Sequence, residues 1–272
     1  MDLRGIARGT LDWEQLEAVA TTLARRHGRE EVHVEFPDAD NWLSIPMVVD
    51  GEWFVKVVTP QNSLFHAVLT GARNLGTVAA GTEQVFDHFG TPLAMAEHEL
   101  EATRRMRAAG VAAPDPVEAF EVDGLGVLVL EYLPAFRPLD AVARDRLDAL
   151  AEDLFANLAR LPAAGGVPGD LRAENVLLQD GDLYFIDATA VRSAVADADS
   201  RGIAAGEAYD LACALAMLAP RLGTRRAVEA ARSRYADEAL LSALSFLDFV
   251  DLRPDHDFDA AGVKLEIERA TA

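Results

Sequence analysis

The segment from Gly169 to Thr189, GDLRAENVLLQDGDLYFIDAT, constrains the fold of this chain more than any other. It begins with a polar turn, in which Asp170 and Asn175 lie five residues apart, and continues as two short apolar runs that favour a hairpin. Asp187 ends the second run. Oxygen ligands held by strands at a fixed separation suit Mg²⁺ and the transfer of phosphate from a metal nucleotide. The alternative is a polar hairpin whose Asp and Asn residues serve only turn chemistry.

The charge balance limits the classes of function that the chain can have. Its 272 residues include 45 acidic and 25 basic residues, for a net charge of −20. Because 50% of the residues are hydrophobic, the acidity belongs to a folded surface rather than to a disordered tail. Such a surface suits a high-salt cytoplasm, and we expect a halophilic archaeon as the source. No basic run exists, so we expect no broad nucleic-acid-binding face.

We expect a cytoplasmic protein without a membrane segment. No run approaches the roughly 18 apolar residues of a membrane span, and the N-terminal sequence lacks the apolar core of a signal peptide. The single cysteine, Cys213, lies in an apolar helical run and is interpreted as a small buried hydrophobic residue. The six histidines are dispersed without the spacing of zinc ligands on a helix.

The periodicity of the apolar residues predicts two unequal lobes. We expect helices at 11–27 and 93–109, an apolar helix-like piece at 64–69, and strands at 31–36, 42–49, 52–59, 117–122 and 126–132. After Pro134 and Pro138 the pattern is mainly helical, with helices at 139–160, 208–219, 225–235 and 237–251 and a short terminal helix.

This order predicts an α+β fold with a small β-rich N-lobe that has one main helix, and a mainly helical C-lobe. We divide the chain into an N-terminal helical extension (1–30), the N-lobe (31–134) and the C-lobe (135–272).

Lys56 is the second candidate for a functional residue, because it lies in the apolar run WFVKVV of a chain with only two lysines. A buried ammonium needs a partner, since an unpaired buried charge costs several kcal/mol. The 93–109 helix offers Glu97, Glu99 and Glu101, of which only one can point straight at the sheet. The alternative is a solvent-facing lysine on an alternating strand.

These features together resemble the protein-kinase-like superfamily, and in detail the RIO family of atypical kinases. AEHELEATRRMRAAGVAAPDPVEAF is similar to that family's helix and following Gly-Val-x-x-Pro-x-Pro turn, VLVLEYLP to its hinge, and IDAT to its Ile-Asp metal strand. The motifs occur in order over roughly residues 31–218. The resemblance implies a bilobal protein-kinase-like fold that uses ATP and Mg²⁺.

The resemblance also implies roles for residues around the phosphates. Asp170 would orient the acceptor hydroxyl, and Asn175 and Asp187 would hold Mg²⁺. Lys56 would contact the α- and β-phosphates and would pair with Glu99, which lies eleven residues before Gly110 as the family spacing has it.

The adenine and the γ-phosphate have candidate contacts of their own. The backbone of Glu131 and Leu133 would meet adenine, and the side chains of Leu177 and Ile186 would line its pocket. Arg172 could make a bidentate contact with the γ-phosphate through its guanidinium group, or it could be an ordinary surface arginine.

The function implied is that of a serine/threonine kinase or an ATPase. The phosphate acceptor would be a protein or the chain itself, and RIO relatives act in the maturation of pre-ribosomal particles. Two alternatives stay open, a small-molecule phosphotransferase like the aminoglycoside or choline kinases and a non-catalytic nucleotide-binding scaffold. Arg172 stands where the small-molecule kinases typically have a histidine, and PDADNWLS stands where a glycine-rich loop is expected.

Overall fold

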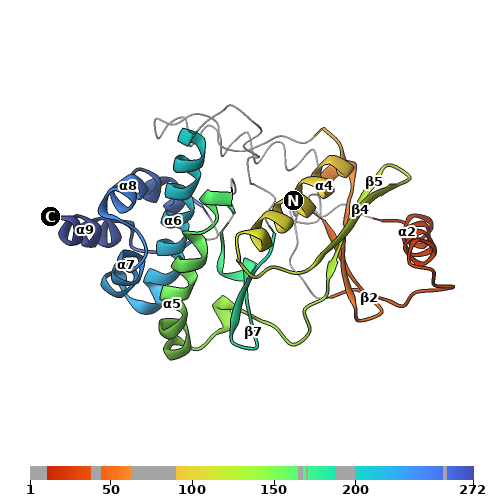
Figure 1. Cartoon of the computed structure of the whole chain (residues 1–272), viewed down its shortest axis with the longest axis horizontal. Helices are drawn as coiled ribbons and strands as arrows, with labels where there is room; N and C mark the ends of the chain where they lie inside the picture. The colour runs from red at the N-terminus through yellow and green to blue at the C-terminus, as the bar shows by residue number, and fades with distance from the viewer. Residues whose placement is uncertain are drawn as a thin grey trace. The chain divides into compact units, whose positions relative to one another are not determined.

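The computed structural model describes residues 11–37, 44–62, 90–164, 168–169, 171–187, 200–253 and 256–272. The described chain forms two compact units (Figure 1). The first unit comprises the described residues up to 62 together with 90–104 and 114–134. The second comprises 105–113 and the described residues from 135 onward. The expected helix-like piece at 64–69 lies outside the described residues.

A five-stranded antiparallel sheet forms the body of the first unit. Its spatial order is β1-β2-β3-β5-β4. The strands are β1 (Val34–Glu35), β2 (Ile45–Val49), β3 (Trp53–Val58), β4 (Pro116–Val122) and β5 (Leu125–Glu131). The β2–β3 and β4–β5 hairpins close through Asp50-Gly51 and Asp123-Gly124, in which all four residues have positive φ. Two central residues with positive φ make the turn whose twist matches that of paired strands, so these Asp-Gly pairs set the registers of both hairpins.

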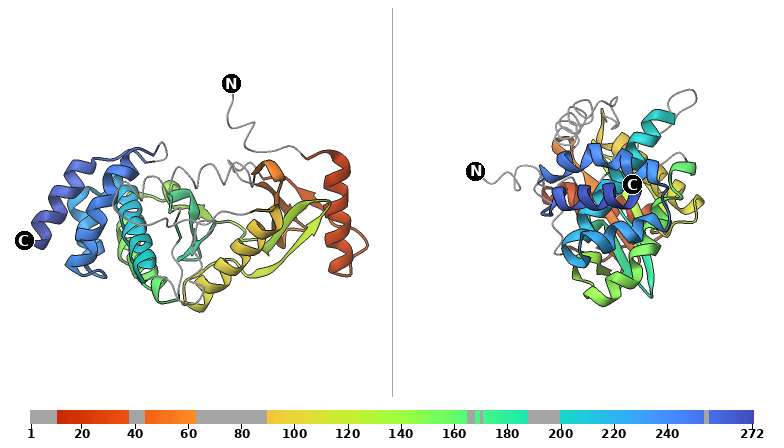
Figure 2. Two further views of the ribbon diagram at one scale, coloured as in Figure 1. Left: turned by 90° about the horizontal axis from the view of Figure 1, so that it is seen from above. Right: turned by 90° about the vertical axis from the view of Figure 1, so that its left-hand side faces the viewer.

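Helices cover both faces of this sheet. Helix α2 (Trp13–Arg26) packs Val19 and Leu23 on one face, against a cluster that includes Val55 and Val127. Helix α4 (Pro92–Ala108) packs on the opposite face, where Leu128 belongs to its cluster. Figure 2 shows the two helices on opposite sides of the strands. Because both faces are covered, β5 is buried along almost its whole length and reads as a continuous apolar run instead of an alternating one.

The C-terminal end of α2 is fixed to the sheet by charged and aromatic groups. Arg26 donates two hydrogen bonds to Glu118 on β4, and the ring of His27 contacts the same carboxylate at 3.0 Å. The His27 ring also packs against Trp53 at a tilt of 38° with the centroids 4.2 Å apart, and the Arg29 guanidinium lies 4.3 Å from the Trp53 ring centroid. These contacts make α2 part of the same compact unit as the sheet.

The second unit is built mainly from helices. They are α5 (Arg144–Leu158), α6 (Ser200–Leu222), α7 (Thr224–Arg232), α8 (Asp237–Asp251) and α9 (Ala260–Thr271). Helices α6 and α7 each contact the other four, and α6 is the central one because its contacts with α5 and α8 are the more extensive. Contrary to the expectation from the sequence, the α6 segment Ile203–Leu222 is long and apolar enough, by length and composition, to span a membrane, although 72% of its most apolar window is buried inside the protein.

A small antiparallel sheet completes the second unit, in the order β6-β7-β8. It consists of β6 (Arg137–Pro138), β7 (Val176–Gln179) and β8 (Asp182–Phe185). Strands β7 and β8 turn at Asp180-Gly181, again with both residues at positive φ. The Phe185 N–H donates to the Ala112 carbonyl at 2.9 Å, which joins the hairpin to the segment after α4.

The α+β class expected from the sequence is confirmed, with an antiparallel sheet in the N-terminal region and a mostly helical C-terminal region. Some boundaries were wrong. The strand expected at 31–36 is paired only at Val34–Glu35. The helix expected from 139 begins at Arg144, because Pro138 pairs in β6 and the next three residues form a separate 3₁₀ turn. Helix α6 begins at Ser200, eight residues before the expected 208.

Candidate functional site

The first unit contains a buried ion pair between Lys56 and Glu99. Lys56 lies on β3, opposite Leu128 of β5, on the face of the sheet that α4 covers. Its Nζ donates to Glu99 Oε1 at 2.5 Å, and the two residues are 4% and 3% exposed. The flanking Val55 and Val57 point to the opposite face and pack with α2, as the period of a strand requires.

Helix geometry decides which glutamate Lys56 meets. Glu97 and Glu101 are exposed, whereas Glu99 lies between Ala96 and Leu100 on the face of α4 that packs on the sheet. A buried ion pair of this kind contributes little to the stability of the fold, since the cost of desolvating both groups offsets most of their Coulombic attraction. Its presence in an otherwise apolar interface therefore points to a use for the charge of Lys56.

The close packing of α4 on the sheet depends on a glycine in β5. A Cβ built at Gly126 would lie 2.2 Å from the carbonyl oxygen of Pro92, the first residue of α4. No side chain fits at that distance, so the backbones of the helix start and of the interior strand β5 touch directly. This contact fixes the N-terminal end of α4, the helix that carries Glu99.

The end of β5 carries the residues that were expected to meet adenine. The N–H of Glu131 donates to the Asp115 carbonyl at 2.8 Å, and its carboxylate accepts from the Asp115 N–H at 3.0 Å. The Glu131 N–H is therefore engaged within the protein, and any backbone contribution of this residue to a ligand falls to its carbonyl. Leu133 follows as a buried residue that is 5% exposed.

The second unit brings Asn175 and Asp187 to one end of the β7–β8 hairpin. The N–H of Ile186 donates to the Asn175 carbonyl at 3.0 Å, next to the ladder pair Val176 and Phe185. The hairpin therefore holds the two expected metal ligands on neighbouring strand ends. Asn175 is 5% exposed and Asp187 is half-buried.

Asp187 also has an uncommon backbone conformation. Its φ is +63°, in the left-handed region that few residues other than glycine occupy. Aspartate tolerates this region better than most residues, and such conformations concentrate at functional sites. Asp187 lies two residues after the end of β8.

Leu177 and Ile186 lie on the same hairpin. Leu177 is buried at 4% exposure and pairs with Tyr184, and Ile186 is half-buried. Both belong to the second unit.

Arg172 has a partner within its own turn. Its Nη1 lies 2.5 Å from Glu174 Oε1, and the arginine side chain is 27% exposed. Glu174 is itself half exposed, so the pair lies at the surface, where such bridges contribute little to stability. The effect of the pair is to limit the directions in which the guanidinium can point.

Asp170 lies outside the described residues, but the residues on both sides of it are placed. Gly169 is buried, and its N–H donates to Oδ1 of Asp210 at 2.9 Å. Leu171 is 1% exposed. Asp210 is on α6 and is 3% exposed, so a buried carboxylate of the central helix anchors the residue directly before Asp170.

Sequence reasoning missed Asp210. The signal was available, because Asp210 is an acidic residue in the apolar run YDLACALAML of a helix that was expected to be buried. The surroundings are acidic as well. Burial raises the pKa of Glu207, one turn earlier, and burial raises the pKa of Tyr235, which the charges of Glu207 and Asp210 raise further.

The oxygen donors of Asn175 and Asp187 fit a magnesium site that water and substrate phosphates complete, rather than a metal site in which protein groups supply every ligand. Among the described residues, no group of three or more His, Cys, Asp or Glu side chains is placed to hold a metal ion. Mg²⁺ typically takes one or two carboxylates and completes its shell with water and substrate phosphates. The oxygens of Asn175 and Asp187 fit that pattern.

Comparison with known protein families gives a match for part of the chain. Residues 79–198 match the RIO domain, and the matched range contains every candidate described above except Lys56 and Asp210. No curated protein matches the chain. Over residues 79–198 the chain thus matches the RIO domain, the domain of the RIO-type atypical kinases.

Proposed function

We propose that the protein is an ATP- and Mg²⁺-dependent phosphotransferase of the RIO type, which acts as a serine/threonine kinase or as an ATPase. The observation that carries the proposal is the buried pair of Lys56 and Glu99. Lys56 lies outside the residues that match the RIO domain, whereas Glu99 lies inside them, so the burial of this lysine is an observation that the match does not contain.

The residues divide the work between them. Lys56, oriented by Glu99, contacts the α- and β-phosphates as a fixed positive charge. Asn175 and Asp187 hold Mg²⁺, which neutralises charge on the phosphates when it is bound. Asp170 orients the hydroxyl that attacks the γ-phosphorus.

In the reaction, a bond forms between the acceptor oxygen and the γ-phosphorus while the bond to the bridging oxygen of ADP breaks. The hydroxyl proton passes to Asp170 and then to solvent. The chain has little covalent chemistry to perform, because positioning and charge stabilisation supply most of the catalysis in phosphoryl transfer. With water in place of the hydroxyl, the same groups hydrolyse ATP.

For the acceptor we propose a serine or threonine hydroxyl of a protein, with the chain itself as one substrate. Family resemblance extends this proposal to a pre-ribosomal particle. The net charge of −20 supports a salt-rich cytoplasm as the place of action.

The test is incubation of the full chain with γ-labelled Mg-ATP in molar-range KCl, alongside Asp170→Ala and Asp187→Ala. Asp182→Ala is the matched control, because Asp182 is an exposed aspartate on the same hairpin. Label on the protein, lost in the two site variants and kept in the control, supports the kinase. Release of labelled phosphate with the same pattern supports the ATPase.

Three results would overturn the proposal. Turnover that appears only with added aminoglycosides or choline would assign the site to a small-molecule phosphotransferase. Nucleotide binding without any turnover, unchanged in the variants, would leave a non-catalytic scaffold. Failure of the wild-type chain to bind Mg-ATP would reject the catalytic assignment as a whole.

A further inference from the structure

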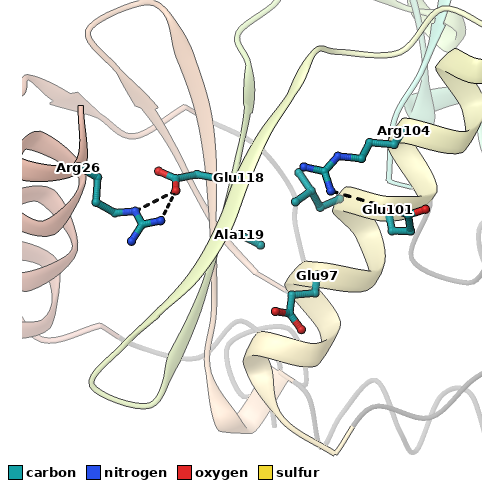
Figure 3. A pocket seen from close by; sticks show the side chains of 7 residues that line it. Arg26, Glu97, Glu101, Arg104, Glu118 and Ala119 are labelled. Carbon is teal, nitrogen blue, oxygen red and sulfur yellow. Dashed lines mark hydrogen bonds and ion pairs between the residues drawn. The ribbon is translucent and has the colours of Figure 1, made fainter. Parts of the chain in front are cut away.

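The first unit has a pocket that the phosphotransfer residues do not use. It has a volume of about 470 Å³ and lies beside β4, the strand at one edge of the sheet (Figure 3). Helix α4 lines it with Glu97, Leu100, Glu101 and Arg104. Strand β4 contributes Glu118 and Ala119, and α2 contributes Arg26.

The outer edge of β4 carries backbone N–H and C=O groups that point away from β5. Within the described part of the chain, β4 pairs only with β5. The two-residue turn at Asp123-Gly124 makes Val122 and Leu125 a hydrogen-bonded pair, and the alternation of an antiparallel ladder then turns the N–H and C=O of Ala119 outward. The irregularity in the register lies nearer the start of the strand, between Pro116 and Glu118, so it leaves this phase unchanged.

The charges that line the pocket do not balance. Arg26 is paired with Glu118 at 2.5 Å, and Arg104 lies 3.8 Å from Glu101. Glu97 has no ion-pair partner among the described residues and is exposed, and its side chain projects from α4 on the side facing β4 (Figure 3). The pocket therefore has one carboxylate in excess, above an apolar floor formed by Leu100 and Ala119.

We propose that this edge is a docking site for an extended segment of a partner protein that carries an arginine or lysine. The segment adds a strand to β4 through the backbone of Ala119, and its basic side chain lies on the α4 side, against Glu97. Main-chain pairing gives such complexes their affinity, and alternate side chains give them their specificity. A second copy of the chain is a poor occupant, because each copy has a net charge of −20 and would repel the other.

The binding test measures how tightly the full chain binds a set of fluorescein-labelled pentapeptides. Each peptide is a variation on the sequence Thr-Val-Arg-Val-Thr. Fluorescence anisotropy is read at the lowest KCl concentration at which circular dichroism shows the chain to be folded. Two matched probes accompany each peptide, one with glutamate in place of arginine and one methylated at alternate backbone nitrogens. We expect both changes to weaken binding by about tenfold or more, which is the scale of a close interfacial charge pair.

Variants of the chain locate the site. Glu97→Lys should weaken binding of the arginine peptides by about tenfold and should improve binding of the glutamate peptides. Glu17→Lys, at an exposed position of α2, makes the same charge change away from the pocket and should bind like the wild type. Ala119→Pro removes the outward N–H of an edge strand, where proline is tolerated, and should weaken every peptide alike. Thermal unfolding of each variant verifies its fold.

Three results would reject the docking site. They are no binding by any arginine peptide, equal binding of arginine and glutamate peptides, and binding that neither Glu97→Lys nor backbone methylation reduces. Dimerisation of the chain that Ala119→Pro abolishes would assign the edge to self-association instead.

Discussion

The carboxylate of Asp210 holds the N–H of Gly169 at 2.9 Å, although 41 residues separate the two in sequence. The bond links the central helix of the second unit to the residue that precedes Asp170. Because both groups are buried, water cannot replace either partner if the other is removed. The position of the loop before Asp170 therefore depends on α6.

Replacement of Asp210 should separate positioning from binding. Asp210→Ala leaves the Gly169 N–H buried without its acceptor, at a cost of about 1–3 kcal/mol in the free energy of unfolding. We expect kcat of ATP turnover to fall while KM for ATP changes little, and Asp210→Asn to restore most of kcat because its amide oxygen can accept the same bond. Urea unfolding and steady-state kinetics measure the two effects. Equal losses in the Ala and Asn variants would contradict a positioning role.

The Lys56 and Glu99 pair should behave as a coupled unit. Lys56→Met leaves a carboxylate buried without its counter-charge, and Glu99→Leu does the reverse, so each should destabilise the chain by about 3–5 kcal/mol. The double variant should be more stable than the sum of the single losses predicts, since it buries no charge. A double-mutant cycle in urea unfolding measures the coupling. Strict additivity would show that the two charges do not depend on each other.

Gly126 should not tolerate a methyl group. Gly126→Ala places a Cβ 2.2 Å from the Pro92 carbonyl oxygen, which is a backbone atom and can move only if the helix start moves. Overpacking of this kind typically costs about 1–3 kcal/mol, and we expect a lower melting temperature with weaker ATP binding. The control is Gly90→Ala, two residues before α4, where a Cβ meets nothing within 4 Å. Similar melting temperatures for the two variants would show that the helix start is free to move.

Magnesium dependence should identify the ligand residues. Asn175→Ala should raise the Mg²⁺ concentration for half-maximal turnover by roughly tenfold or more, since even residues outside the metal's direct ligands commonly contribute that much. Chelation with EDTA should abolish turnover in all variants, and Asp182→Ala should keep the wild-type magnesium curve. An unchanged curve for Asn175→Ala would remove this residue from the metal site.

The attachment of α2 to the sheet should weaken in acid. Burial alone would raise the pKa of Glu118, but hydrogen bonds and charge from Arg26, with a further contribution from His27, outweigh it and lower the pKa from its ordinary value of 4.5. A carboxylate with a lowered pKa stabilises the folded state above its unfolded pKa, and this contribution is lost as the pH falls through the folded pKa.

Glu118→Gln should therefore unfold more readily than the wild type at pH 7, and the gap should narrow once the pH falls below about 4.5. Chemical denaturation at a series of pH values measures the gap. Glu14→Gln, at an exposed position in the first turn of α2, is the control. A gap that is constant with pH would exclude the ionised form of Glu118 as its source.

The sequence predicted the α+β class because local signals set it. Asp50-Gly51 and the periodicity of α4 each specify their element without help from distant residues. The set of three candidate glutamates for Lys56 also came from local spacing, and helix geometry then placed Glu99 on the buried face.

Long-range contacts account for what the sequence did not predict. The engagement of the Glu131 N–H by Asp115 depends on how β4 enters the sheet, and the role of Asp210 depends on where α6 packs. Neither Asp115 nor Asp210 belongs to a periodic pattern of apolar residues that would have indicated its contact. The short extent of β1 has a similar origin, because Val34–Glu35 is an edge strand whose pairing depends on its neighbour β2.

The packing of α2 has a consequence for the order of synthesis. Val19 and Leu23 are completely buried, yet their cluster includes Phe120 and Val127, which are translated about 100 residues later. At roughly 5–20 residues per second, the apolar face of the helix waits on the order of 5–20 seconds for its partners. A nascent chain of this protein therefore exposes the apolar face of its N-terminal helix until β4 and β5 emerge. A chaperone that shields this face during that interval would raise the yield of folded protein.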